Sequence, residues 1–260
     1  MEIRKIKACV FTGAGTTMEV ARRFAGACGV PAEVADITPR DSEVPEFEPG
    51  DLAVFAVPSY MGRVPAPAAE KLACARGAGT PAVLLVTYGN RAVDDTFIEL
   101  ADIAGERGFV PVALGAIVAH HSLMVNVAVG RPDGEDLAVV DELAARTMDR
   151  LAKAGCAADA AVSEIPGNRP YRDANGTAFK PVTDAARCAM CGVCVGECPT
   201  GAIDPEDPTA TDAERCVSCF RCIAACPAGA RSIGGGEALA AARASFGEKL
   251  AERKDSYMVL

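Results

Sequence analysis

The 260-residue chain contains no tryptophan, only two histidines and few aromatic residues. It also lacks an excess of positive charge, because its formal net charge is −9 at neutral pH. Nucleic acids and anionic membranes attract basic surfaces, so neither is an expected partner. An acidic surface suits instead a protein that docks onto basic patches of other proteins.

Long apolar runs are absent as well. The longest stretches, such as 112–119, are far shorter than the roughly 20 residues that a membrane-spanning helix needs. The N-terminal segment MEIRKIKACVF has charges and no long apolar core, so no signal peptide is predicted. We therefore expect a cytoplasmic protein with no membrane span. In that reducing compartment, the twelve cysteines do not indicate a disulfide framework.

Eight of the cysteines form an internal repeat with the pattern C-x-x-C-x-x-C-x-x-x-C-P. The segment CAMCGVCVGECPTGAI is followed 28 residues later by CVSCFRCIAACPAGAR. Three thiolates within seven residues can surround one corner of a cuboidal cluster, and this run holds 4Fe–4S clusters in bacterial two-cluster ferredoxins. The sequence therefore predicts two 4Fe–4S clusters.

In that class the fourth cysteine of each run ligates the other cluster. The predicted ligands of cluster I are Cys188, Cys191, Cys194 and Cys226, and those of cluster II are Cys216, Cys219, Cys222 and Cys198. Crossed ligands tie the two halves of the segment together, so loss of one cluster should unfold both. A pair of zinc sites is the alternative, because paired C-x-x-C is also zinc spacing.

The other four cysteines lie outside these runs. They are Cys9, Cys28, Cys74 and Cys156. Their isolated positions favour buried structural thiols.

Residues 1–157 alternate between short apolar runs and helical periodicity. The predicted strands are Ile6–Thr12, Ala32–Ile37, Leu52–Val57, Ala82–Thr87 and Val110–Ala119. The predicted helices are Thr16–Ala27, Pro67–Arg76, Asp94–Arg107 and Asp133–Ala154. This alternation predicts an α/β domain with a doubly wound parallel sheet. Ligands bind such sheets at the carboxyl ends of the strands.

The remaining sequence divides into three parts. Residues 158–181 are rich in proline, glycine, asparagine and charge, which predicts a linker. Residues 182–235 leave almost no room for an apolar core, so this small α+β domain needs the metal clusters to fold. Residues 236–260 are predicted to form a C-terminal helix.

The loop after the first strand, Phe11–Thr17, has the sequence FTGAGTT. Its glycines let the backbone approach an anion, and the following helix offers free N–H groups and a positive dipole end. The hydroxyls of Thr12, Thr16 and Thr17 can donate to phosphate oxygens. The loop has no Lys or Arg, which suits a monophosphate such as that of FMN.

This loop has three alternative interpretations. A dinucleotide fingerprint requires G-x-G-x-x-G/A, and Met18 stands at its third position, although Asp36 lies where a ribose-binding acid would. A Walker P-loop requires a G-K pair that this loop lacks. The third alternative is a tight turn without a ligand.

Two further loops follow the third and fourth strands. They contain Pro58, Ser59, Tyr60, Met61 and Gly62, and then Tyr88, Gly89, Asn90 and Arg91. A flat ring system could be held between Tyr60 and Tyr88. A doubly wound fold brings these loops and the first loop together at the edge of the sheet.

With these motifs the chain resembles a family in which a flavodoxin-like domain is fused to a two-cluster ferredoxin, common in anaerobic microbes. The matching segments are FTGAGTT, PSYMGRVP, TYGNRAVDD, AHHSLMVNVAVGRPD and IPGNRPYR. The resemblance implies a five-stranded sheet of order 2-1-3-4-5. It also implies an FMN bound by Thr12, Gly13, Ala14, Gly15, Thr16, Thr17 and the two later loops. The family often has a hydroxyl residue where this chain has Ala14.

The function implied by the resemblance is electron transfer between the clusters and FMN, with redox proteins as partners. The alternative is an FMN-dependent reductase of a small acceptor such as a quinone, with His121 or Tyr60 as proton donor. A redox sensor or scaffold with structural clusters is a third hypothesis. The resemblance raises the prospect that His121 touches the flavin or the ferredoxin domain, and the alternative is an ordinary polar surface or core residue. Arg131 is expected to be solvated, and the alternative is an ion pair with acidic groups across the domains.

Overall fold

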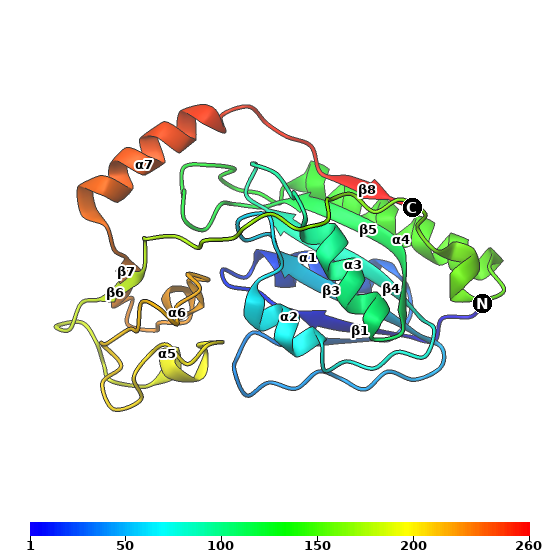
Figure 1. Ribbon diagram of the computed structural model, residues 1–260, viewed down its shortest axis with the longest axis horizontal. Coiled ribbons are helices and arrows are strands. Elements are labelled where there is room, and N and C mark those ends of the chain that lie inside the picture. Colours follow the sequence, from blue (N-terminus) through cyan, green and yellow to red (C-terminus); the bar gives the residue numbers. More distant parts are fainter.

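The apolar runs of the N-terminal part form a central sheet in the computed structural model, which describes residues 1–260 (Figure 1). Its parallel strands are β1 (Lys5–Val10), β2 (Ala32–Asp36), β3 (Asp51–Pro58), β4 (Thr80–Tyr88) and β5 (Phe109–Val118). They pair in the order β2-β1-β3-β4-β5. This is the flavodoxin-like order, so the predicted fold class is confirmed.

Four helices cover the sheet in two layers. They are α1 (Thr16–Ala27), α2 (Ala66–Leu72), α3 (Thr96–Glu106) and α4 (Gly134–Lys153). Side chains alternate between the two faces along each strand. Ile6 and Val10 of β1 therefore pack into the core under α1 and α4. Cys9 packs into the core under α2 and α3, on the opposite face.

The C-terminal segment departs from the predicted helix. Helix α7 (Gly236–Lys249) ends early, and β8 (Tyr257–Val259) adds a sixth, antiparallel strand beside β5. The unpaired edge of β5 offers backbone hydrogen-bonding groups to any extended segment that reaches it. A three-residue strand is too short to show a periodicity of its own, so it could not be recognised from the sequence.

The small domain contains little regular structure. Strands β6 (Pro181–Thr183) and β7 (Arg231–Ile233) pair antiparallel, and a 3-10 turn, Ala157–Ala160, precedes the domain. Helices α5 (Val193–Gly196) and α6 (Arg221–Ala224) have four residues each. Its core has five buried residues, and three of them are cysteines. A core of this size needs a further source of stability.

Residues 161–180, which lie within the predicted linker 158–181, have no regular secondary structure but are bound along α3. The backbone N–H groups of Arg172 and Asn168 donate to the Asp95 carboxylate over 2.7 and 2.9 Å. These hydrogen bonds hold the pKa of Asp95 below its usual value. Arg169 pairs with Asp102, which lies further along α3. The segment is therefore a strap between the domains rather than a free tether.

A second strap returns from α7 to the N-terminal domain (Figure 1). Asn90 donates to the carbonyl oxygens of Leu250 and Glu252, both over 2.8 Å. The Arg131 guanidinium donates to the Lys254 carbonyl over 2.7 Å and forms a bidentate ion pair with Asp136. Arg131 is thus buried, not solvated as expected, because this ion pair and the strap enclose it.

None of the helices combines the length and the apolar character required to cross a membrane.

Replacing Arg131 with methionine should destabilise the N-terminal domain. The change leaves the buried Asp136 carboxylate without its counter-charge, which costs about 3–5 kcal/mol of unfolding free energy. Urea unfolding followed by circular dichroism measures this loss. The control is Lys153→Met, because Lys153 and Asp149 form an exposed pair and the loss should stay within about 0.5 kcal/mol. Equal effects of the two substitutions would contradict the account.

Candidate functional site

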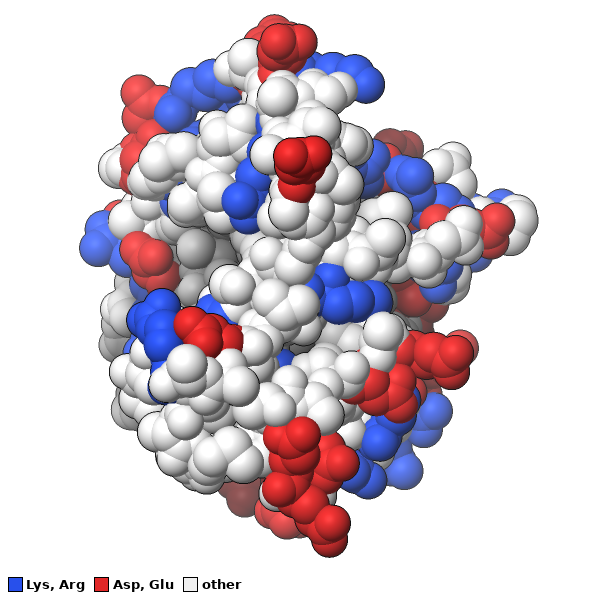
Figure 2. All heavy atoms as spheres, turned by 90° about the vertical axis from the view of Figure 1, so that its left-hand side faces the viewer, with Lys and Arg blue, Asp and Glu red and all other residues white.

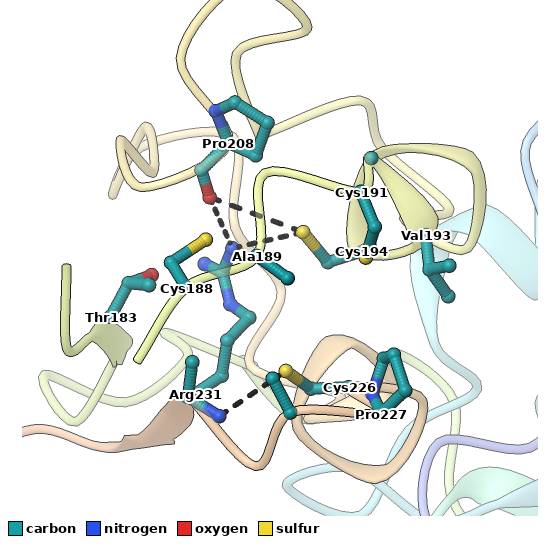
Figure 3. Close-up of a pocket in the computed structure, with 13 residues that line it drawn as sticks. Thr183, Cys188, Ala189, Cys191, Val193, Cys194, Pro208, Cys226, Pro227 and Arg231 are labelled. Atoms are coloured by element: carbon teal, nitrogen blue, oxygen red, sulfur yellow. Dashed lines mark hydrogen bonds between the residues drawn. The ribbon is translucent and has the colours of Figure 1, made fainter. Parts of the chain in front are cut away.

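The small domain brings its cysteines together in two groups. Figure 3 shows the first pocket, which is lined mostly by apolar atoms. Its cysteines are Cys188, Cys191, Cys194 and Cys226. A second pocket is lined by Cys198, Cys216, Cys219 and Cys222. Each pocket thus combines three cysteines of one run with the fourth cysteine of the other run, which is the grouping that crossed ligation requires.

Backbone N–H groups point at the sulfurs in both pockets. Ala202 donates to Cys198 Sγ over 3.2 Å, and Ala230 donates to Cys226 Sγ over 3.3 Å. Burial acts to raise the pKa of Cys226, but backbone N–H groups such as that of Ala230 outweigh it and lower the pKa below its usual value. Hydrogen bonds of this kind favour the thiolate, which is the metal-binding form. The residues present therefore fit iron–sulfur clusters.

Single metal ions have no matching arrangement in the structure. No group of three or more His, Cys, Asp or Glu side chains is placed to hold one ion. In each pocket the four cysteines instead line the wall of a shared cavity.

The four remaining cysteines differ in exposure. Cys9 and Cys28 are buried, as expected, and burial raises the pKa of each to about 12. Cys74 and Cys156 are exposed, so the prediction that these two thiols are buried was wrong. Helix α2 ends at Leu72, which leaves Cys74 outside it, and Cys156 precedes a surface 3-10 turn.

The second pocket lies against the N-terminal domain. The Tyr60 hydroxyl lies 3.5 Å from the Cys219 carbonyl oxygen, and Cys219 packs against the core beneath α2 and α3. A Cβ atom at Gly13 would come within 2.0 Å of the same carbonyl. Only glycine at position 13 permits this close approach. The cysteines of the first pocket are the more exposed set, because Cys191 is exposed whereas Cys198, Cys219 and Cys222 of the second pocket are buried.

An arginine inside the second cysteine run joins the domains. The Arg221 guanidinium pairs with Asp36 at the end of β2 over 2.8 Å and with Glu197 over 2.6 Å. Asp36 is therefore engaged in an interdomain ion pair rather than free for a ribose. Sequence reasoning missed this role, because the cysteine spacing carries no information about the residues between the ligands.

The loop before α1 is formed as a phosphate site would be. Gly15 has a left-handed backbone with φ of 99°, and α1 has no side-chain cap. The hydroxyl of Thr12 accepts from Gly15 N, and those of Thr17 and Thr87 bond to each other. Thr16 and the first N–H groups of α1 remain available to an anion. The loop therefore fits a phosphate group, although fewer hydroxyls are available than expected.

A groove opens beside this loop. It is lined by Thr12, Gly15, Met18, Glu19, Arg22, Val34, Asp36 and Arg221. Ala14 is exposed and offers no hydroxyl. The two arginines of the lining are balanced by Glu19 and Asp36, and Arg221 is paired with Asp36. None of these charged residues belongs to the loop itself.

The other two predicted loops meet at the same edge of the sheet. Ser59 accepts from the Thr96 hydroxyl over 2.8 Å, and the Gly62 carbonyl accepts from Asp95 N over 3.0 Å. Pro58 is half-buried at the end of β3, and the Met61 side chain is 46% exposed. An exposed apolar side chain at this edge suits contact with a flat ring system.

Tyr88 and Asn90 have a different role from the one expected. Tyr88 is buried, and its hydroxyl donates to the Asp255 carbonyl over 3.1 Å. Asn90 is buried as well and holds the same C-terminal strap. Arg91 pairs with Asp94 in its own loop. The structure thus does not show a ring-binding grip between Tyr60 and Tyr88, because Tyr60 faces Cys219 and Tyr88 faces the strap.

His121 packs closely over Gly89. A Cβ atom at Gly89 would lie 2.6 Å from the His121 ring. Burial, then the nearby His120 and Arg91, lower the pKa of His121 to about 4, so the ring is neutral at neutral pH. Its Nδ1 accepts from the backbone N–H groups of Leu123 and Met124. A neutral imidazole held this way is poorly suited to the proton-donating role in a reductase.

Comparison with known proteins identifies the small domain. Residues 180–227 match the family model of the 4Fe–4S dicluster domain. The chain therefore carries a dicluster domain behind a flavodoxin-like α/β domain, and the match favours iron–sulfur clusters over zinc. No match was found among curated proteins.

Solved structures similar to the N-terminal domain include three flavodoxins. One from Streptococcus pneumoniae TIGR4 has 19% identity and a TM-score of 0.43, covering 58% of this chain and 99% of that chain. One from the domain Archaea has 16% identity and a TM-score of 0.44, covering 57% and 99%. Flavodoxin 1 from Bacillus cereus has 19% identity and a TM-score of 0.41, covering 56% and 97%.

Substituting Cys198 with serine should remove at least one whole cluster, and not only a single iron atom. Cys198 lines the second pocket but belongs to the first cysteine run, so its loss opens both halves of the domain. We expect iron to fall from about eight atoms per chain to four or fewer, measured after anaerobic purification. The control Cys74→Ser changes an exposed thiol outside both pockets and should keep about eight. Unchanged iron in Cys198→Ser would contradict the grouping.

Proposed function

We propose that this protein transfers electrons between two 4Fe–4S clusters and an FMN held by the N-terminal domain. The contact at Cys219 is the observation that carries the proposal. This cysteine of the second pocket touches Tyr60 and Gly13, which belong to two of the loops assigned to FMN. A cluster in that pocket and a flavin on those loops would therefore be neighbours.

The residues assigned to each cofactor are those of the two pockets and three loops. Bound 4Fe–4S clusters exchange single electrons, and a bound flavin can take one or two. The free N–H groups of α1 and Thr16 would hold the FMN phosphate. Met61 and Tyr60 would contact its ring.

The two pockets differ in how far their cysteines are exposed to solvent. Cys198, Cys219 and Cys222 of the second pocket are all buried, which excludes water from the side that faces the flavin loops. In the first pocket, by contrast, Cys191 is exposed to solvent. An external partner would meet the cluster I end, and the flavin would be the inner end of the path.

The outer face is suited to contact with another protein. Met190 and Val193, next to ligands of the first pocket, are 54% and 40% exposed. Figure 2 shows uncharged atoms over much of the middle of this face, with many of the acidic groups toward its lower edge. We propose a redox protein with a basic rim as the partner, in keeping with the net charge of −9. A cytoplasmic location, where thiols stay reduced, belongs to the same proposal.

Placing a carboxylate at the start of α1 should weaken FMN binding without loosening the fold. In Thr16→Asp the new charge repels the phosphate, while an acidic residue there stabilises the helix by about 0.3–1 kcal/mol. Quenching of flavin fluorescence on titration into the full-length protein measures affinity. We expect binding at least tenfold weaker for FMN.

Riboflavin serves as the control ligand because it lacks the phosphate. Its affinity should be the same for the native protein and for Thr16→Asp. Failure of the native protein to bind FMN would overturn the flavin part of the proposal, as would equal FMN affinity in the variant.

A further inference from the structure

The two halves of the dicluster domain follow the same local plan. Arg187 and Arg215 each precede the first cysteine of a run. Arg187 donates to the Ala228 carbonyl over 3.2 Å, and Arg215 donates to the equivalent Thr200 carbonyl over 2.8 Å. The internal repeat therefore provides a matched comparison between the surroundings of the two pockets.

One buried position breaks this symmetry. Aligning CPTGAI with CPAGAR places Ile203 of the first half opposite Arg231 of the second half. Ile203 is 2% exposed and lines the second pocket, whereas Arg231 is 4% exposed and lines the first pocket. One pocket thus has an apolar wall where the other has a buried guanidinium.

The buried guanidinium has no carboxylate partner. Its Nη1 donates to the Pro208 carbonyl over 2.9 Å and lies 3.4 Å from Cys194 Sγ. Its Nη2 donates to the Thr211 hydroxyl, and its Nε has no hydrogen-bond partner. Figure 3 shows the side chain extending from β7 toward Cys194 and Pro208. Removing an arginine from water without a counter-charge is costly unless a negative group lies beside it.

A second unpartnered atom lies on the same wall. The buried hydroxyl oxygen of Thr183, which pairs with Arg231 across β6 and β7, also has no hydrogen-bond partner. Both residues line the first pocket. The orphaned donors and the thiol contact together indicate that the missing partner of Arg231 is a negatively charged group in that pocket.

We propose that Arg231 sets the reduction potential of cluster I, making it the more easily reduced of the two clusters. The inference rests on the cluster assignment within the proposed function but not on FMN. An arginine side chain stays protonated in proteins. Each electron added to cluster I adds negative charge beside this fixed cation, in surroundings where water screens it little.

Arg221 and Lys180 near the second pocket do not stabilise a reduced cluster as strongly as Arg231 does in the first pocket. Arg221 is neutralised there by Asp36 and Glu197. Lys180 donates to the Cys216 carbonyl over 2.6 Å but is only half-buried. An electron in the domain is therefore held mainly at cluster I, the outer end, from which a partner collects it.

The test is a redox titration of the full-length protein with dithionite, which is oxidised to sulfite as it supplies electrons. Optical and electron paramagnetic resonance spectra follow the two clusters. We expect two reduction steps in the native protein. Arg231→Ile introduces the residue that stands at the equivalent position, 203, of the other half. In this variant the potential of the more positive reduction step should move toward that of the more negative step. Electron occupancy of cluster I relative to cluster II should fall at least tenfold, equal to about 59 mV for a one-electron couple.

Two further variants separate charge from packing. Arg231→Lys keeps the charge and should keep most of the separation between the steps, whereas Arg231→Gln should lose it. The matched control is Arg187→Met, which removes an exposed arginine and should leave both steps unchanged. Equal movement of both steps in Arg231→Ile, or movement of neither, would overturn the inference.

Iron content distinguishes this inference from the cluster assignment on which it rests. About eight iron atoms per chain with unchanged potentials would refute the role of Arg231 and leave the clusters standing. If the Arg231 variants lose iron, the salt dependence of the two reduction steps in the native protein tests the inference instead. The separation between its steps should persist from 0.05 to 1 M salt, because a buried charge is screened little. Collapse of the separation at high salt would overturn the inference.

Discussion

The close contact between the Cys219 backbone and the loop before α1 determines how the rest of the molecule can work. A carbonyl oxygen can lie this near the loop only because position 13 has no side chain. The contact places the pocket with the buried cysteines against the carboxyl edge of the sheet, while the other pocket includes the exposed Cys191. The proposed order of cofactors, from cluster I through cluster II to the flavin, follows from this contact. The structures of the two domains taken separately would not determine it.

Two straps and one ion pair keep that contact in place. Residues 161–180 bind along α3, and the segment after α7 binds Asn90, Arg131 and the edge of β5. Arg221 joins Asp36 to Glu197 across the interface. Each attachment is made by charged side chains or backbone groups at positions that follow no periodic sequence pattern. The dicluster domain is therefore bound at both of its ends, which suits a fixed path between cofactors better than a swinging carrier.

Much of this could be predicted from the sequence where the pattern is strong. Helix α1 has the predicted bounds and the sheet is doubly wound, because periodicity and chain alternation determine both. The strand order is the one that the family resemblance implied. The roles of Tyr88 and Asn90 could not be predicted, because their partners lie 167 and 160 residues away in the chain. Strand β8 is too short for periodicity. Arg231 left a signal in the repeat, as the charged counterpart of Ile203.

The most direct test of the account is whether electrons pass within one molecule. The full-length protein, loaded with FMN, would be mixed rapidly with less than one equivalent of dithionite while absorption of the clusters and the flavin is recorded. Redistribution between the clusters and the flavin should be first order, with a rate constant independent of protein concentration. A rate that rises in proportion to concentration would show transfer between molecules and contradict a path through the Cys219 contact.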